Sequence, residues 1–226
     1  RAAVPSVAIA GYTNAGKSSL LNRLTGAGVL VEDALFATLD PATRRARTAD
    51  GRIYTLSDTV GFVRHLPHQL VEAFRSTLEE VAQADLVLHV VDGAHADPQE
   101  QVRAVREVLA EVGAERVPEL LVVNKTDAAD EDTLLRLKRL WPEAVFVSAR
   151  TGAGLDSLRE RIEQRLPRPA RQLEVLLPYE RGDLVARAHE RGEVLRSEHT
   201  DKGTELVVRV DDTLAAELAP YLMTAA

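Results

Sequence analysis

The chain has 226 residues, contains no cysteine and carries a formal net charge of −7 at pH 7. This length holds one domain of ordinary size and a small additional unit. The lack of cysteine excludes a disulfide framework and a thiolate metal site, so we expect a reducing, cytoplasmic environment. No apolar run approaches the ~20 residues that cross a bilayer, and no signal peptide is recognisable. The negative charge argues against bulk electrostatic binding to nucleic acid but is compatible with a local basic face.

A glycine-rich loop follows the first expected strand, residues 7–10, and precedes a helix expected from Ser19. The loop consists of Gly11, Tyr12, Thr13, Asn14, Ala15, Gly16, Lys17 and Ser18. Between a strand and a helix, this pattern lets backbone N–H groups surround phosphate oxygens at the helix N-terminus. The Lys17 ammonium can then reach the β- and γ-phosphates, and the Ser18 hydroxyl can bind Mg²⁺. The pattern therefore predicts a nucleoside triphosphate site.

Two short segments downstream fit the remaining parts of such a site. They are Phe36, Ala37, Thr38, Leu39 and Asp40, and, after an expected strand at 53–57, Asp58, Thr59, Val60 and Gly61. Asp58 suits an outer-sphere carboxylate for Mg²⁺, and the Gly61 N–H suits the γ-phosphate. The order of the motifs makes Thr38 the candidate switch threonine, whose hydroxyl completes the Mg²⁺ shell when the triphosphate is bound. We therefore assign Ser18, Thr38 and Asp58 to the metal, and Lys17, Thr38, Gly61 and Asn14 to catalysis.

Two further motifs predict which base is bound. Asn124, Lys125, Thr126 and Asp127 follow a buried strand at 120–123, and Ser148, Ala149 and Arg150 follow another at 144–147. The Asp127 carboxylate can accept from guanine N1–H and the 2-amino group together, whereas adenine lacks this donor pair and would leave the carboxylate unpaired. The Lys125 stem can cover the base, and Asn124 can tie this loop to the phosphate loop. The Ala149 N–H suits guanine O6.

The motifs together resemble the GTPases of the translation-factor-related class, and more closely the HflX family of ribosome-associated GTPases. The resemblance lies in residues 11–18, 36–41 and 58–68, continues into 70–80, and extends to 177–179 and 185–187. It implies a switch that binds GTP and GDP with Mg²⁺, associates with the large ribosomal subunit, and splits or recycles stalled ribosomes under stress. Family members carry a further domain before this one, and since the chain begins at Arg1 we expect it to be a piece of a longer protein.

Strands and helices alternate from Val7 to Leu166, which predicts an α/β fold with a doubly wound, mostly parallel sheet. Helices are expected at 69–82, where Leu70, Phe74 and Leu78 are spaced four apart, and at 98–112, 130–140 and 155–166. The strand C-termini carry every motif named above. We assign residues 1–166 to a P-loop GTPase domain and residues 167–172 to a linker, because Pro167 and Pro169 interrupt the last helix.

Residues 173–226 are expected to form a small α+β domain. A strand is expected at 172–177, a helix at 181–191, a hairpin at 193–199 and 204–210 with its turn at 201–203, and a final helix at 213–222. A unit of this size buries a modest core, so we expect it to lean on the GTPase domain. It contains no catalytic constellation, which predicts a binding or positioning role.

The residue after the Asp-x-x-Gly motif bears on the rate of hydrolysis. Ras-like enzymes place Gln there to orient the attacking water, but this chain has Phe62, which cannot hydrogen-bond water. Slow intrinsic hydrolysis is therefore expected, with a group supplied from elsewhere. Arg64 is a possible arginine finger and otherwise a surface side chain, and His65 and His68 are interpreted as solvated or helix-capping side chains. Asn14 either stabilises the loop or, as in related GTPases with the Asn-Ala-Gly-Lys-Ser loop, helps to hold a K⁺ ion that replaces an arginine finger.

Two arginine clusters could contact RNA. One spans residues 44–47, and the other consists of Arg159, Arg161, Arg165, Arg168 and Arg171. Most such runs are solvated faces, and neither cluster has the interleaved aromatic residues of a single-strand binder. Three functions stay open: a ribosome-coupled GTPase switch, a K⁺-activated GTPase that regulates a protein or RNA-modifying partner, and a guanine-nucleotide sensor with negligible turnover. We expect the protein to be a monomer.

Overall fold

A computed structural model of the chain describes residues 4–26, 43–59 and 75–223. The chain divides into two compact units. The larger unit comprises Ser6–Ala46 and Thr55–Leu166, and the smaller comprises Arg1–Pro5, Arg47–Tyr54 and Pro167–Ala226. Within the described residues, no helix is long and apolar enough to cross a membrane.

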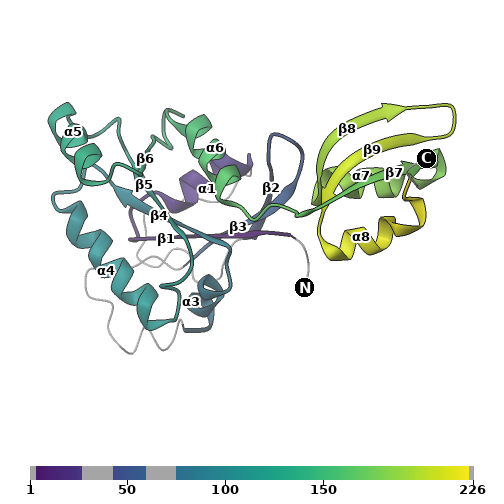
Figure 1. The fold of residues 1–226 in the computed structure, drawn as a ribbon. Coiled ribbons are helices and arrows are strands. Elements are labelled where there is room, and N and C mark those ends of the chain that lie inside the picture. Colours follow the sequence, from purple (N-terminus) through teal and green to yellow (C-terminus); the bar gives the residue numbers. More distant parts are fainter. Residues whose placement is uncertain (1–3, 27–42, 60–74, 224–226) are drawn as a thin grey trace. The chain divides into compact units, whose positions relative to one another are not determined.

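The larger unit is built on a six-stranded sheet in the order β2-β3-β1-β4-β5-β6 (Figure 1). The strands are β1 Ser6–Gly11, β2 Thr43–Arg47, β3 Ile53–Asp58, β4 Leu86–Asp92, β5 Glu119–Asn124 and β6 Val145–Phe146. From β3 through β6, every neighbouring pair is parallel. Their registers pair Ile9 with Asp58 and Asp92 with Asn124, so the motif-bearing strand ends lie along one edge of the sheet. The predicted fold class is confirmed.

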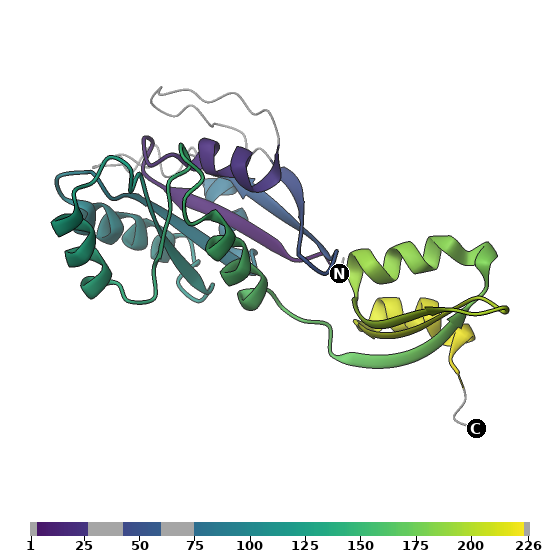
Figure 2. The ribbon, with the colours of Figure 1, turned by 90° about the horizontal axis from the view of Figure 1, so that it is seen from above.

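Helices cover both faces of this sheet. They are α1 Lys17–Thr25, α3 Arg75–Ala82, α4 Pro98–Glu111, α5 Glu131–Leu140 and α6 Leu155–Arg165. Figures 1 and 2 show α1 and α6 side by side on one face, and α3 with α4 on the other. The face predicted at helical spacing is buried where it is described, because Leu78 and Val81 pack with Val105 and Leu109 against β1 and β4.

Side-chain caps explain where two of these helices begin. The Asp97 carboxylate accepts from the Glu100 N–H at 3.1 Å before α4, and the Asp130 carboxylate accepts from the Thr133 N–H at 2.7 Å before α5. Each cap satisfies a backbone donor that the first helical turn leaves without a partner. At the other end, α5 is closed by Trp141, which packs against the core that contains Leu137. The predicted bounds of these helices therefore agree with the observed ones to within one residue.

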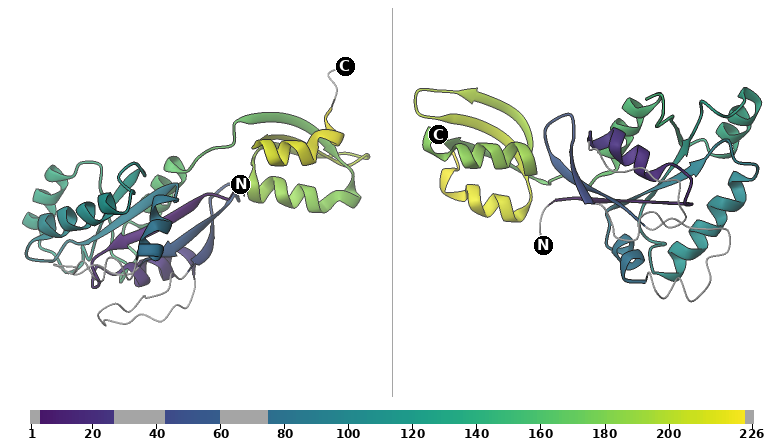
Figure 3. Two further views of the ribbon diagram at one scale, coloured as in Figure 1. Left: turned by 90° about the horizontal axis from the view of Figure 1, so that it is seen from below. Right: turned by 180° about the vertical axis from the view of Figure 1, so that it is seen from behind.

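The smaller unit contains a three-stranded antiparallel sheet in the order β7-β9-β8. Its elements are β7 Arg171–Leu177, a 3₁₀ turn at Tyr179–Arg181, α7 Gly182–Arg191, β8 Glu193–His199, β9 Thr204–Val210, α8 Asp212–Leu218 and a second 3₁₀ turn at Ala219–Tyr221. Both helices lie on one face of the sheet (Figure 3). There Leu206 and Val208 pack with Leu184 and Leu214. The unit thus has a hydrophobic core of its own.

Three sequence expectations differ from these elements. The strand β7 begins at Arg171, inside the expected linker. The last helix ends at Leu218 instead of residue 222, because Pro220 lacks the N–H that an α-helix would require there. The strand β2 was not predicted at all.

Polar composition explains why β2 escaped prediction. In this edge strand Arg44, Arg45 and Arg47 are exposed, and Ala46 alone is buried. Charged side chains protect exposed strand edges but remove the alternation of apolar and polar residues by which strands are recognised. The first arginine cluster therefore lies on a sheet edge.

Candidate nucleotide-binding site

The phosphate loop joins the end of β1 to the start of α1, and its two glycines are sterically required. A Cβ atom at Gly11 would lie 2.3 Å from the Val90 carbonyl oxygen, and one at Gly16 would lie 2.3 Å from Asn124 Nδ2. Gly16 also has a φ of 92°, in the left-handed region. The glycine pattern predicted for phosphate binding therefore reflects close approaches of the loop to β4 and to Asn124.

Lys17 is buried at the first position of α1. Its Nζ donates to the Tyr12 carbonyl oxygen at 3.2 Å. Burial lowers the pKa of this ammonium, and the nearby Asp58 carboxylate partly opposes that effect. A buried cation at a helix N-terminus is an energetically costly arrangement in the absence of an anion, and a phosphate group would relieve it.

The predicted Mg²⁺ ligands on α1 and β3 lie together. The Ser18 hydroxyl donates to Asp58 Oδ2 at 2.9 Å, and Asp58 is 1% exposed. A hydroxyl beside a carboxylate supplies the hard oxygen atoms that Mg²⁺ prefers, so this pair fits the ion. The neighbouring Thr59 has a different task, because its hydroxyl donates to the Ile9 carbonyl oxygen at 2.7 Å. Its side chain anchors β3 to β1.

Asn124 joins the phosphate loop to both predicted base-binding motifs. Its Nδ2 donates to the Ala15 carbonyl oxygen at 2.9 Å, and its Oδ1 accepts from the Ala149 N–H at 3.0 Å. The residue is 2% exposed. The Ala149 N–H, predicted to face guanine O6, therefore already has a partner, which any base would have to share or replace.

Lys125 adds a second link between the loops. Its Nζ donates to the Asn14 carbonyl oxygen at 2.7 Å and lies 3.3 Å from Asp92 Oδ2. The backbone of Lys125 is left-handed, with a φ of 63°, and the Thr126 N–H donates to the Val147 carbonyl oxygen at 3.2 Å. Because non-glycine residues seldom adopt this conformation, the surrounding contacts hold the motif in one geometry.

Asp127 is held by the third motif. The Ser148 hydroxyl donates to Asp127 Oδ1 at 2.8 Å, while Arg150 Nη1 lies 3.6 Å from Oδ2. The Asp127 side chain is 20% exposed and Ser148 is fully buried. A carboxylate oriented in this way is suited to accept hydrogen bonds from a ligand at the surface.

Several predicted site residues lie outside the described residues. These are Phe36, Ala37, Thr38, Leu39, Asp40, Val60, Gly61 and Phe62, together with Arg64, His65 and His68. Their assigned roles stay predictions. Asn14 is described and exposed, and its assigned role with K⁺ also stays a prediction.

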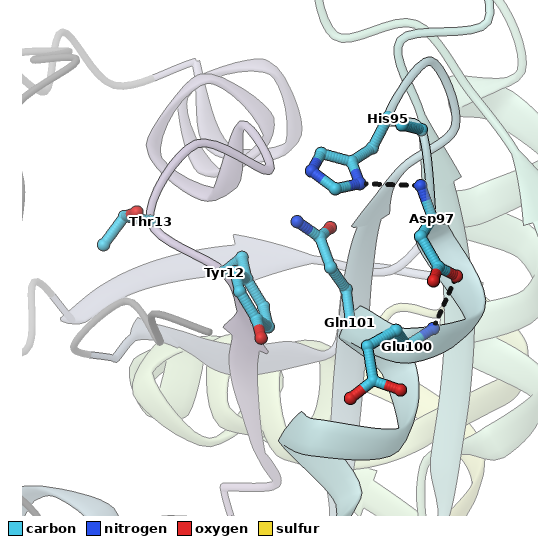
Figure 4. A pocket seen from close by; sticks show the side chains of 7 residues that line it. Tyr12, Thr13, His95, Asp97, Glu100 and Gln101 are labelled. Atoms are coloured by element: carbon cyan, nitrogen blue, oxygen red, sulfur yellow. Dashed lines mark hydrogen bonds between the residues drawn. The ribbon is translucent and has the colours of Figure 1, made fainter. Parts of the chain in front are cut away.

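A cavity of about 450 Å³ opens beside the start of the phosphate loop (Figure 4). It is lined by Tyr12, Thr13, His95, Ala96, Asp97, Glu100 and Gln101. The His95 Nδ1 accepts from the Asp97 N–H at 3.0 Å, which leaves Nε2 to carry the proton of the neutral ring. This cavity was not predicted, since its residues on α4 and just before it form no recognisable motif.

Sequence reasoning also missed Asp92 and Arg23. Asp92 is the last residue of β4 and lies beside Lys125. Its position at the C-terminal end of a parallel strand, where ligands bind in such sheets, was the signal that could have identified it as a site residue. Arg23 lies in the last turn of α1 and donates to the Ala149 and Arg150 carbonyl oxygens. No motif marks it, because its partners are more than a hundred residues away.

The second arginine cluster is largely paired with acidic side chains. Arg159 lies 3.1 Å from Asp156, Arg161 lies 3.9 Å from Glu143, Arg168 lies 3.8 Å from Glu193 and Arg171 lies 3.4 Å from Asp212. Paired arginines present less net positive charge to a polyanion. The structure therefore weakens the RNA interpretation of this cluster.

Comparison with known proteins agrees with this geometry. Residues 6–125 match the family described as 50S ribosome-binding GTPase, and residues 136–224 match the HflX C-terminal domain. A GTPase HflX of Caldanaerobacter subterraneus is 43% identical over 225 residues, which cover 98% of this chain and 50% of the relative. The GTPase HflX of Escherichia coli is 47% identical over 192 residues, which cover 84% and 45%. The chain thus spans about half the length of the curated relatives that it matches.

Solved structures show the same fold. A GTP-binding protein from Sulfolobus solfataricus in complex with GDP has a TM-score of 0.55 and 34% identity, covering 71% of this chain and 52% of that one. Era of Aquifex aeolicus, bound to GDP and AlF₄⁻, has a TM-score of 0.58 at 23% identity and covers 88% and 74%, which supports the fold alone. The phosphate loop, the guanine motifs and both domain matches together lead to one conclusion: the chain belongs to the HflX family of GTPases.

Proposed function

We propose that this chain binds GTP and GDP with Mg²⁺, hydrolyses GTP slowly, and in its GTP-bound form associates with the large ribosomal subunit. The observation that carries the nucleotide part is the double link made by Asn124, which joins the phosphate loop to the Ala149 N–H. A single buried amide thus holds the two halves of one ligand site in register. Such preorganisation reduces the entropy that binding would otherwise cost.

Each described site residue has a defined task in this proposal. Lys17 neutralises phosphate charge at the N-terminus of α1. Ser18 and Asp58 would hold Mg²⁺, which when bound would neutralise phosphate charge. Asp127 reads the N1–H and 2-amino group of guanine and rejects adenine. The 148–150 segment completes the base site, with Ser148 fixing the Asp127 carboxylate.

The hydrolytic step is expected to be slow in isolation, because Phe62 occupies the position of the water-orienting Gln in Ras-like enzymes. We assign Thr38, Gly61 and Asn14 to this step, and Asn14 is the residue that would help to hold a K⁺ ion, which would supply the positive charge of an arginine finger. Steady-state GTP hydrolysis in K⁺ and in Na⁺ buffers tests the ion. Equal rates in the two buffers would contradict its role.

The ribosomal part of the proposal is supported by the domain matches, one of which is described as a 50S ribosome-binding GTPase. We infer that GTP strengthens binding to the large subunit and that the family's splitting or recycling of stalled ribosomes extends to the protein that contains this chain. Co-sedimentation with purified large subunits, in GDP and in a non-hydrolysable GTP analogue, is the deciding experiment. It should be run on this chain and on the longer protein, and no nucleotide-dependent pelleting of either would refute the ribosomal role.

A further inference from the structure

Arg23 makes an unusual contact between the last turn of α1 and the third nucleotide motif. Its Nε donates to the Ala149 carbonyl oxygen at 2.8 Å, and its Nη2 donates to the Arg150 carbonyl oxygen at 2.6 Å. The planar guanidinium is able to bridge two consecutive carbonyls because its donors form a fixed fork. One side chain therefore holds two successive peptide groups of the segment that we assign to the base.

Holding these carbonyls also fixes the direction of backbone N–H groups. In a planar trans peptide, the N–H points opposite to the C=O, so the bond to the Ala149 oxygen directs the Arg150 N–H away from Arg23. The next N–H, of Thr151, donates to the Ser148 hydroxyl at 3.1 Å. The Ala149 N–H donates to Asn124. The Ala149 N–H lies in the preceding peptide, whose carbonyl oxygen on Ser148 accepts from the Gly152 N–H, so Arg23 orients the N–H groups of residues 150 and 151 only.

The same helix begins at the phosphates. Its first residues are Lys17 and Ser18, and Arg23 follows within the same nine-residue helix. The Arg23 carbonyl oxygen is in turn held by Arg159 Nη2 at 2.9 Å. The helix α1 is therefore anchored at one end to the phosphate site and at the other end to the 149–150 segment.

We propose that Arg23 is a positioning residue for guanine: by fixing the peptide group between residues 149 and 150, it holds the Arg150 backbone N–H against the 6-oxo group of the base. This inference rests on the guanine reading proposed above. The alternative is that Arg23 only ties α1 to the neighbouring loop and contributes to folding stability. The two differ in which nucleotides are affected when Arg23 is replaced.

The test compares two nucleotides that share the 2-amino group and differ in the 6-oxo group and in the N1–H. They are GDP and the diphosphate of 2-aminopurine riboside, titrated with Mg²⁺ into the 226-residue chain. The N1–H, which we assign to Asp127, contributes the same difference in wild type and in an Arg23 variant, so a change in preference between the two proteins reports on the 6-oxo group. Wild type should prefer GDP. In Arg23→Ala this preference should fall by about fivefold or more, mainly through weaker GDP binding, because a hydrogen bond from a poorly oriented donor loses most of its energy. Arg23→Lys should fall between the two, since a single ammonium cannot reproduce the fork.

Two variants separate positioning from stability. Arg139→Ala removes an exposed arginine from the last turn of another helix of the same unit, and it should leave both affinities unchanged. Arg159→Ala removes the bond to the Arg23 carbonyl but leaves the guanidinium fork, so it should retain the preference for GDP even if it lowers the melting temperature.

Each outcome is decisive. If Arg23→Ala weakens both nucleotides equally, or weakens neither, the positioning role is overturned. If Arg159→Ala abolishes the preference as strongly as Arg23→Ala does, general loosening of α1 explains the effect and the proposal fails. If wild type itself does not prefer GDP over the 2-aminopurine nucleotide, both the 6-oxo reading and the role of Arg23 are refuted.

Discussion

The larger unit and residues 167–223 differ in what they bury. The larger unit encloses Lys17, Asp58, Thr59, His89, Asn124 and Ser148 among its apolar side chains. Among the described residues of 167–223, Thr204 is the only buried polar residue, and the remaining buried residues are apolar. Buried polar groups cost free energy unless they are paired, and they concentrate where a ligand is bound. The contrast indicates that residues 167–223 fold mainly by apolar packing, whereas the larger unit encloses paired polar groups beside the nucleotide motifs.

The largest expected effect comes from a substitution in the predicted base-binding site of the larger unit. Asp127→Asn replaces a pure acceptor by an amide that presents donors, so the variant should favour xanthine nucleotides, whose 2-oxo group accepts. We expect the GDP-to-XDP preference to change by on the order of 10³-fold or more, as for other sites that demand a hydrogen bond. Competition titration with the two nucleotides measures it. An unchanged preference would mean that the Asp127 carboxylate does not read the base.

A core substitution in the smaller unit should give the opposite result. Leu206 is 1% exposed, and Leu206→Ala should destabilise the unit by roughly 2–5 kcal/mol through lost burial and a residual cavity. GDP affinity should stay as in wild type. Urea unfolding monitored by circular dichroism, together with a nucleotide titration, provides both numbers. The matched control is Leu195→Ala, because Leu195 is 44% exposed, and a large effect there would argue against simple apolar packing.

Lys17→Ala should separate binding from stability within the larger unit. The variant should lose about 10- to 100-fold in GTP affinity, as expected when a charge-assisted hydrogen bond to phosphate is removed. Stability of the nucleotide-free protein should not fall, because burial already disfavours the Lys17 ammonium and lowers its pKa. Thermal melts with and without nucleotide report both quantities. A clear destabilisation without nucleotide would show that Lys17 also has a structural role.

The smallest expected effect concerns a half-buried carboxylate that belongs to none of the nucleotide motifs. Glu119 lies 3.3 Å from His89 Nδ1 and accepts from Arg106 at 2.7 Å. Burial would raise its pKa, but the hydrogen bonds from His89 and Arg106 outweigh burial and lower the pKa to about 2. Since the pKa is lower in the folded than in the unfolded chain, the stabilisation is present above pH 4.5 and is lost as the pH falls toward 2.

Glu119→Gln should therefore cost roughly 1–3 kcal/mol at pH 7 and flatten the decline of stability between pH 4.5 and 2. Urea denaturation of both proteins at pH 7, 4 and 3 measures this difference. GDP affinity at pH 7 should be unchanged. If the free energy of unfolding falls equally in both proteins as the pH is lowered, Glu119 is not the source of the acid sensitivity. If Glu119→Gln lowers GDP affinity, the hydrogen bonds among Glu119, His89 and Arg106 also support the nucleotide site.

Most of the larger unit was accessible from sequence because its strands are apolar runs that end in recognisable motifs. The phosphate loop and Asn124 were placed by spacing, and the hairpin of β8 and β9 by its alternation and its turn at Gly203. What escaped prediction depends on tertiary contacts or on polar edges. Arg23 acts through carbonyls far along the chain, Asp92 pairs with Lys125 only in the folded sheet, and β2 is concealed by its arginines.

Trp141, which closes α5, gives the protein an internal optical probe. It is the single tryptophan of the chain, and it lies against the core of the larger unit. Among residues 167–226 the absorbing side chains are the tyrosines Tyr179 and Tyr221. Fluorescence excited at a wavelength that tyrosine does not absorb comes from Trp141, so it reports the unfolding of the larger unit alone. Circular dichroism, by contrast, registers both units. Comparing the two unfolding curves of the unlabelled protein therefore tells whether the two units unfold together.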